Sequence, residues 1–365
     1  MSVKAAVASG LKEEGKLAEV ASIPKPTVSS KQILVKSVAF AVNPTDWKHL
    51  FYEFSSKGDI VGSDVSGIVE EVGADVTGFA KGDYVSATMH GNVSTNQGAF
   101  CEYAVVDTET AIKYDSSTFS KEGLSVGTHP SSSINSFEAA ASSTLGLCTV
   151  ALSYSNSLKI DAATSKNKTI LIWGGASATG VIAIQVAKLV YGLRVFTTAS
   201  PQNHEFLKSL GADHVFNYRD ADVVDQIRKA GNNTIEYGLD VISSPETFQS
   251  VYDATEGAEN VSLDNLLWLG PTSITTKEGR NVKYGATCAY VVLGTEVKLG
   301  PTTLPPNQEA ADDYNKIWQE ILPKYISQIK TANLKVLPAG LESTNDALEL
   351  LRQNKVSAEK VVWRI

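Results

Sequence analysis

The first 150 residues carry short runs of valine and isoleucine separated by glycine, asparagine, aspartate and proline. Apolar runs of this length, bounded by such residues, are typical of β-strands joined by tight turns. The stretch 67–85 shows the pattern most clearly, because its glycines separate two apolar runs. This part of the chain is therefore predicted to form a compact β-domain.

From residue 168 the pattern changes, and short apolar strands alternate with helical stretches. Alternation of this kind predicts a parallel sheet that is covered on both faces. Serine caps a helix and proline suits its first turn, so Ser200-Pro201 and Ser244-Pro245 are read as helix starts. The sequence predicts strands at 169–173, 194–198, 214–218 and 237–242, and further helices at 180–191 and 221–229.

The pattern breaks again at the proline-containing stretch 301–306. A helix over 310–329, a short strand, an amphipathic helix over 345–353 and a final strand over 360–365 are expected to follow. The final strand is expected to pair back into the first domain. The predicted architecture is thus a β-domain from 1–150 and 305–365, with a doubly wound α/β domain from 151–304 inserted between them.

Length and composition support two folded domains. The chain has 365 residues, of which 43% are hydrophobic and 20% are charged, as in a globular protein that forms ordinary cores. The net charge of −8 and the lack of a basic tract argue against nucleic acid as a partner. No window is apolar enough for a membrane span, and the N-terminus does not resemble a secretory signal. The three cysteines are odd in number and far apart, which predicts no disulfide framework and a reducing, cytoplasmic setting.

A glycine-rich loop is the strongest chemical signal. The sequence Gly174-Gly-Ala-Ser-Ala-Thr-Gly180 follows a predicted strand and opens a predicted helix. Backbone N–H groups and a helix N-terminus at such a loop can hold a phosphate. The alternative is a tight turn without a ligand. The predicted phosphate contacts are Gly175, Ser177, Ala178 and Thr179.

The end of the second strand of this domain bears on the choice of cofactor. NAD-binding domains place an acidic residue there for the ribose 2′-hydroxyl, but residues 198–203 contain none. Ser200 and Asn203 can instead donate hydrogen bonds to a 2′-phosphate, and Tyr218 can cover the adenine or reach that phosphate. Ser200 can also be a helix cap, and the two roles are compatible. NADPH is the predicted cofactor.

Over nearly its whole length the chain resembles the medium-chain dehydrogenase/reductases, which implies a GroES-like β-domain and a Rossmann domain. Asn43, Ser63 and Leu145 stand where zinc-dependent members carry their principal metal ligands, so no metal is expected. Within the zinc-free branch, the chain is most similar to fungal trans-acting enoyl reductases and related yeast reductases. The matching segments are Asn43-Pro-Thr-Asp-Trp-Lys48, Gly98-Ala-Phe-Cys-Glu-Tyr103, Gly174-Gly-Ala-Ser-Ala-Thr179, Phe216-Asn-Tyr-Arg219, Leu239-Asp-Val-Ile-Ser243 and Ser357-Ala-Glu-Lys-Val-Val362.

This resemblance also implies roles for individual residues, around an active site expected between the two domains. Lys48 would contact the nicotinamide ribose, stabilise negative charge or donate a proton, or it is an ordinary exposed lysine. Asn43 would bind a substrate carbonyl or hold its turn, and Thr149 would contact the cofactor. Gly294 and Thr295 would shape the far wall of the site.

The predicted function is therefore zinc-independent, NADPH-dependent reduction of an activated C=C bond or a reactive aldehyde. Quinone reduction and a non-enzymatic, crystallin-like NADPH-binding role are the alternatives. A small molecule is the expected substrate, either free or attached to a carrier protein, and the chain is expected to be a monomer or a homodimer.

Overall fold

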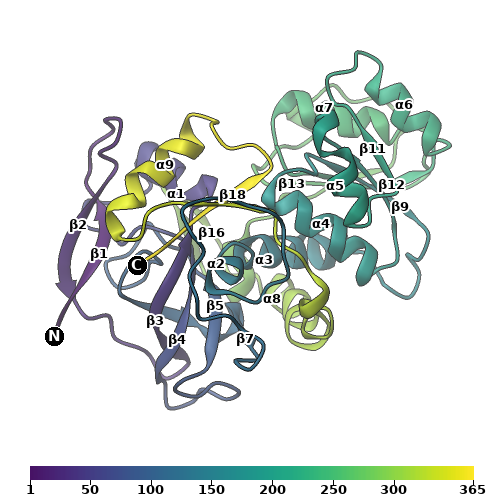
Figure 1. The fold of residues 1–365 in the computed structure, drawn as a ribbon. Coiled ribbons are helices and arrows are strands. Elements are labelled where there is room, and N and C mark those ends of the chain that lie inside the picture. Colours follow the sequence, from purple (N-terminus) through teal and green to yellow (C-terminus); the bar gives the residue numbers. More distant parts are fainter. The chain divides into compact units, whose positions relative to one another are not determined.

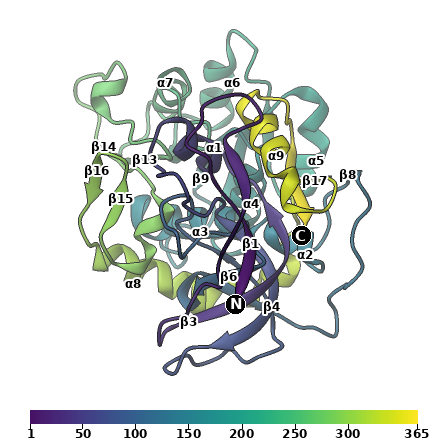
Figure 2. The same cartoon turned by 90° about the vertical axis from the view of Figure 1, so that its left-hand side faces the viewer.

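The computed structural model describes residues 1–365, which form two compact units. The β-unit consists of Met1–Leu145, Thr295–Pro306 and Thr331–Ile365, and the α/β-unit consists of Gly146–Gly294 and Asn307–Lys330. Figure 1 and Figure 2 label the elements of both units from two directions. The predicted class, a β-domain with a doubly wound parallel-sheet domain, is confirmed. No helix is long and apolar enough to cross a membrane.

The β-unit is built on a sheet of eight strands in the order β7-β5-β4-β3-β18-β17-β8, with β6 also paired to β3. A separate pair, β1 and β2, and a small hairpin, β15 and β16, complete its strands. The bounds are β1 Ser2–Ala8, β2 Ala18–Pro24, β3 Gln32–Ala41, β4 Asp64–Val72, β5 Tyr84–Thr88, β6 Tyr103–Asp107, β7 Ala111–Tyr114, β8 Gly127–His129, β15 Val297–Leu299, β16 Thr302–Leu304, β17 Asn333–Val336 and β18 Glu359–Arg364.

The last strand joins the first domain, as predicted. β18 pairs antiparallel with β3, and Val362 lies opposite Ala41. Trp363 is fully buried, and its ring centroid lies 5.6 Å from that of Phe40 and 4.7 Å from that of Phe100. Burial of three aromatic rings stabilises this closure strongly. The helices of this unit are α1 Pro44–Phe51, α2 Phe137–Ala141 and α9 Thr344–Arg352.

The α/β-unit contains a six-stranded sheet in the order β11-β10-β9-β12-β13-β14, in which every pairing is parallel. The chain starts in the middle of the sheet at β9, builds outward to β11, and then crosses to β12 on the other side. Dinucleotides bind at such a switch point, outside the carboxyl ends of the strands. The bounds are β9 Thr169–Trp173, β10 Arg194–Thr198, β11 His214–Phe216, β12 Ile235–Asp240, β13 Val261–Asn265, β14 Val282–Tyr284, α4 Ala178–Leu189, α5 His204–Ser209, α6 Val223–Ala230, α7 Pro245–Ala254 and α8 Gln308–Asn315.

The segment Asn307–Lys330 belongs to the α/β-unit, whereas the sequence-based boundaries placed all of 305–365 in the β-domain. It contains helical turns and no strand that could extend a sheet. The amide of Asn156 donates to the Asp313 carboxylate at 2.9 Å. The Gln185 side chain bonds to both backbone groups of Lys330, each at 2.8 Å. These contacts attach the segment to α4 and to the residues just after α3 (Thr144–Leu152).

Candidate active site

The glycine-rich loop connects β9 to α4, as the sequence predicts. Gly174 has a φ of +93°, a conformation that residues with a side chain rarely adopt. A Cβ at Gly175 would lie 2.0 Å from the hydroxyl oxygen of Thr197 on β10. The two glycines therefore let the loop turn sharply while it stays in contact with the neighbouring strand.

The start of α4 is ordered by its N-cap, Ser177. The Ser177 hydroxyl accepts a hydrogen bond from the Gly180 N–H at 3.0 Å and donates one to the Gly174 carbonyl at 2.8 Å. The first N–H groups of a helix have no partner within the helix, so those of Ala178 and Thr179 could bind a ligand. An anion is further stabilised at this end by the helix dipole. The loop is suited to the diphosphate of a dinucleotide.

Three side chains form a polar cluster beyond the ends of β10 and β11. A guanidinium N–H of Arg219 donates to the Ser200 hydroxyl at 2.6 Å. The same guanidinium stacks 4.5 Å from the centroid of the Tyr218 ring. The hydroxyls of Ser200 and Tyr218 are 3.5 Å apart. A cationic fork flanked by two hydroxyls is a suitable partner for a phosphate group.

This arrangement corrects the prediction that Ser200 caps a helix. Ser200 occupies the cap position of a 3₁₀ turn over Pro201–Asn203, but its side chain makes no capping hydrogen bond. Asn203 lies in that turn and its N–H bonds to the Ser200 carbonyl at 2.9 Å. The α-helix proper starts only at His204. The Ser200 hydroxyl is directed to Arg219 instead, which suits its predicted place beside a phosphate.

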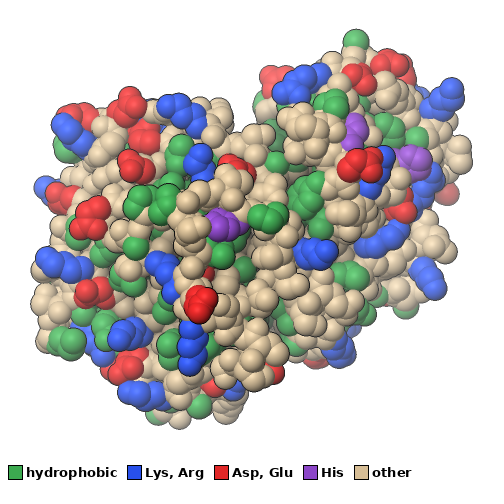
Figure 3. All heavy atoms as spheres, viewed as in Figure 1, with side chains coloured by type: hydrophobic (Ala, Val, Ile, Leu, Met, Phe, Trp, Pro, Cys, Tyr) green, Lys and Arg blue, Asp and Glu red, His purple; other side chains and the backbone are tan.

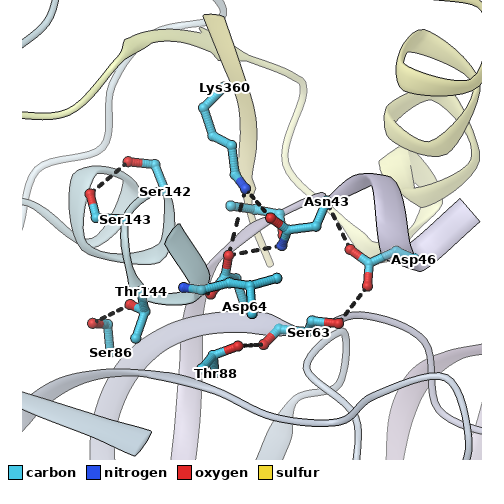
Figure 4. Close-up of polar contacts among 12 residues, drawn as sticks. Asn43, Asp46, Ser63, Asp64, Ser86, Thr88, Ser142, Ser143, Thr144 and Lys360 are labelled. Atoms are coloured by element: carbon cyan, nitrogen blue, oxygen red, sulfur yellow. Dashed lines mark hydrogen bonds and ion pairs between the residues drawn. The ribbon is translucent and has the colours of Figure 1, made fainter. Parts of the chain in front are cut away.

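In the β-unit, a network of buried polar side chains surrounds the start of α1 (Figure 4). The Asp46 carboxylate accepts hydrogen bonds from the Asn43 N–H at 2.7 Å, the Ser63 hydroxyl at 2.8 Å and the Asn92 amide at 3.0 Å. These four residues expose 5% of their surface or less. The first turn of α1 is therefore held in one position.

Asp64 and Lys360 form the other half of this network. The Asp64 carboxylate accepts from the Asn43 amide and from the Leu145 N–H, both at 2.8 Å. The Lys360 ammonium donates to the Asn43 amide oxygen and lies 3.6 Å from Asp64. Burial raises the pKa of Asp64 to about 6, and the Lys360 charge opposes that shift. The Asn43 amide thus uses both its oxygen and its nitrogen within the network.

Lys48 lies on α1, one turn beyond this fixed start. It is half-buried, and its ammonium lies 5.9 Å from the centroid of the Trp47 ring. Burial lowers the pKa of Lys48 from its usual 10.5, because desolvation disfavours the charged form. A lysine in this condition releases a proton more readily than one in water.

The sequence matches two family models, the alcohol dehydrogenase GroES-like domain over residues 29–116 and the zinc-binding dehydrogenase over residues 178–263. A trans-enoyl reductase of Alternaria alternata is 33% identical over 356 residues, which cover 95% of each chain. An uncharacterized protein of Saccharomyces cerevisiae is 33% identical over 364 residues, which cover 96% of this chain and 95% of that protein.

The chain belongs to the zinc-free medium-chain dehydrogenase/reductases. Like other members of this family, the reductase is an oxidoreductase. The solved structure of a quinone oxidoreductase from Coxiella burnetii aligns over the full length of both chains with a TM-score of 0.68 and 22% identity. That likeness supports the fold.

The side chains of this reductase do not fit the zinc ion that the name of the second family model implies. Zinc needs about four nitrogen, sulfur or oxygen ligands in a tetrahedral arrangement. The three positions predicted to replace metal ligands hold an amide, a hydroxyl and an apolar side chain, in Asn43, Ser63 and Leu145. A buried ammonium also lies against Asn43 and Asp64, where it would repel a metal cation. No group of three or more His, Cys, Asp or Glu side chains suited to a metal is found.

The predicted site residues of the reductase lie in several separate places in the structure. Gly175, Ser177, Ala178 and Thr179 lie together at the glycine-rich loop. Past β10, the Ser200 hydroxyl lies 3.5 Å from that of Tyr218, and Asn203 contacts Ser200 through its backbone N–H. In the β-unit, Asn43 is the N-cap of α1 and Lys48 lies on that helix, while Thr295 is exposed at the start of a separate segment. Thr149 is half-buried on α3, and Gly294 ends a 3₁₀ turn with a φ of +68°. The roles proposed for these residues remain predictions.

Arg219 and Lys360 are the two cationic residues of these clusters, and neither had a predicted role. Arg219 follows Tyr218 directly in the sequence, and a basic residue there is a signal for a phosphate that sequence reasoning could have used. Lys360 is 317 positions away from Asn43. Only the pairing of β18 with β3 brings these two residues together, and no local pattern indicates that contact.

Proposed function

We propose that this reductase uses NADPH to reduce the C=C bond of an enoyl or enone substrate. The observation that carries the cofactor assignment is the cluster of Arg219, Ser200 and Tyr218, which offers a cation and two hydroxyls where the ribose 2′-phosphate would lie. The named function of the trans-enoyl reductases among its relatives supports the C=C bond as the reacting group. The substrate would be a small molecule, either free or attached to a carrier protein.

The residues present fit a dinucleotide. Gly175 and the first N–H groups of α4, on Ala178 and Thr179, would hold its diphosphate. Arg219 would pair with the 2′-phosphate, which is absent from NADH, and no carboxylate in residues 198–203 would repel it. When bound, the cofactor supplies a hydride.

Lys48 would manage charge and protons on the substrate. Addition of hydride at the β-carbon of an enone leaves negative charge on the carbonyl oxygen, as an enolate. The Lys48 ammonium would stabilise that charge and then give one proton to the α-carbon, and solvent would return a proton to the amine. A lowered pKa suits this role, since general acids work best when their pKa is near the working pH. Asn43 would keep the first turn of α1, and so Lys48, in place, and Thr149 would contact the cofactor.

A substrate panel tests the proposal. The purified protein would be given an enone, a quinone, an aliphatic aldehyde and an aromatic aldehyde, each with NADPH and with NADH, and the products would be identified. We expect saturated ketone from the enone and faster turnover with NADPH. Alcohol from the aldehydes alone, or hydroquinone alone, would overturn the assignment of C=C reduction. An enoyl thioester supplied free and on an acyl carrier protein would then show whether a carrier is needed.

A further inference from the structure

A buried lysine lies at the centre of the polar network in the β-unit. Lys360 on β18 exposes 7% of its surface, and its ammonium reaches the Asn43 amide oxygen and the Asp64 carboxylate (Figure 4). Lysine is almost never fully buried unless it is paired. Its burial therefore has to be offset by the groups that it contacts.

Those contacts join segments that are distant in the sequence. Asp64 at the start of β4 binds the Leu145 N–H near the start of α3. Asn43, before α1, binds Asp64 through its nitrogen and Lys360 through its oxygen. The ammonium is the one cationic group among these side chains, and Asp46 and Asp64 are the two carboxylates. Removal of the ammonium would leave both carboxylates buried without a cation.

A metal ion at such a site would neutralise acidic side chains and fix the orientation of its ligands. Lys360 has the same two effects here. It neutralises Asp64, and it fixes which way the Asn43 amide faces, because an ammonium donates hydrogen bonds and can only meet the amide oxygen.

We propose that the Lys360 ammonium replaces a metal ion in this unit, as a cation that holds Asn43 and Asp64 and thereby positions the start of α1. Lys360 is in this view a positioning residue. Lys360 acts on Lys48 through Asn43 and the first turn of α1, and this effect rests on the proposed function. The role of Lys360 as the cation of the network does not rest on that function.

The stability test compares five variants by thermal unfolding, one of which is the single variant Asp64→Asn, which leaves the ammonium without its carboxylate and should also lower Tm. Lys360→Met keeps the length of the side chain and removes its charge, and it is expected to lower Tm by about 10 °C, because breaking a buried ion pair leaves a charge unpaired. Lys360→Arg keeps the charge and should lose less. The double variant Asp64→Asn with Lys360→Met removes both charges and should recover most of the loss. Lys335→Met, at a half-buried lysine on neighbouring β17, is the control and should change little.

Two results of this experiment would overturn the proposal. One is a Tm for Lys360→Met equal to that of the wild type. The other is a double variant whose loss is the sum of the two single losses, because additive losses mean that the two charges are not coupled. If Lys360→Met does not fold, the comparison of the wild type with Lys360→Arg and with the double variant still tests whether Asp64 requires a cation at position 360.

Metal content and kinetics complete the test. The wild-type protein should contain no stoichiometric zinc by elemental analysis, and a chelator should leave its Tm unchanged; one bound zinc per chain would contradict the proposal. If the wild type has reductase activity, Lys360→Met should lower kcat by about tenfold or more, because the helix is displaced, and should leave KM for NADPH unchanged. Lys360→Arg should recover the lost kcat. A rise in KM for NADPH at constant kcat would contradict the positioning role. Absence of activity in the wild type would overturn the proposed function, and the Tm and zinc results would still decide the role of the cation.

Discussion

At the scale of single residues, we propose that Arg219 determines the choice of cofactor. Its guanidinium bonds to Ser200 and stacks on Tyr218, so it is held where a 2′-phosphate would meet it. Hydrogen bonds between charged groups contribute about 2 kcal/mol each. Arg219→Ala should therefore raise KM for NADPH by roughly 30-fold and leave KM for NADH unchanged, as measured by steady-state kinetics with both cofactors. Arg219→Lys keeps a charge without the fork and should lie between the two. An equal loss with both cofactors would refute the assignment.

Lys48 is expected to act as the general acid of the reaction. General acid catalysis by a positioned side chain contributes about 10²-fold or more, so Lys48→Met should lower kcat by that factor. In the wild type, kcat should fall as pH rises through the Lys48 pKa, which burial places below the usual 10.5, because only the ammonium can donate a proton. That alkaline limb should be missing from the pH profile of Lys48→Met. Persistence of the limb in the variant would assign it to another group.

Residues in a continuous segment could be predicted from the sequence, whereas contacts between distant residues could not. Gly175 and Ser177 could be placed because the strand, loop and helix that hold them are continuous in the chain. The contact between Arg219 and Ser200 was not predicted because it joins residues 19 positions apart. The prediction that Ser200 caps a helix was wrong because Arg219 binds the Ser200 hydroxyl instead.

At the scale of elements, the junction of β9, the glycine-rich loop and α4 depends on the absence of a side chain at Gly175. Thr197 on β10 is fully buried and its hydroxyl donates to the Ile172 carbonyl at 2.7 Å, so it cannot move aside freely for a Cβ at Gly175. Gly175→Ala should lower Tm by several degrees and weaken NADPH binding, since overpacking costs about 1–3 kcal/mol. Adding Thr197→Ala should recover part of both losses, as measured by thermal unfolding and by titration with NADPH. Wild-type stability and binding in Gly175→Ala would show that the contact is not tight.

Element boundaries followed the sequence where local signals agree. The strands β9 and β10 occupy their predicted residues, and Ser244 caps α7 through a hydrogen bond from the Thr247 N–H. β11 ends at Phe216, two residues earlier than predicted. The predicted helix over 310–329 is regular only over Gln308–Asn315 and continues as a π-helical turn over Lys316–Ile321 and short 3₁₀ turns. Pro323 lies in the first of these 3₁₀ turns, where it cannot donate the hydrogen bond that a regular helix needs.

At the scale of the whole molecule, buried carboxylates make stability depend on pH. Asp264, in the α/β-unit, is fully buried and accepts from the Ser153 and Thr287 hydroxyls, both at 2.6 Å. Burial raises the pKa of Asp264 from 3.8 to about 6. The folded state then binds a proton more tightly than the unfolded state. This contribution to stability is complete below pH 3.8 and is lost as pH rises through about 6.

The isosteric variant Asp264→Asn tests this pH dependence. The neutral amide removes the titration, so the contribution of this site to the gain in stability between pH 7 and pH 4 should disappear. The contribution is at most about 3 kcal/mol, measured as the difference between wild type and variant in the free energy of unfolding at each pH. A difference that stays constant across this range would show that Asp264 has an ordinary pKa.

The two-unit organisation could be read from the chain because the change from β-strands to alternating strands and helices is a property of long segments. The domain boundaries could not be predicted, since the attachment of Asn307–Lys330 depends on side chains such as Asn156 and Gln185 in distant helices.

The distribution of charge over the surface agrees with the composition. Lys, Arg, Asp and Glu are interspersed on the face drawn in Figure 3. A mixed face of this kind gives no support to binding of nucleic acid.

We propose that the reductase delivers hydride to a C=C bond rather than to a carbonyl group. An α,β-unsaturated aldehyde contains both groups in one molecule, so a single reaction with deuterium-labelled NADPH decides between them. We expect a saturated aldehyde that carries deuterium at the β-carbon, identified by mass spectrometry and NMR. An allylic alcohol with deuterium at the carbonyl carbon would contradict it.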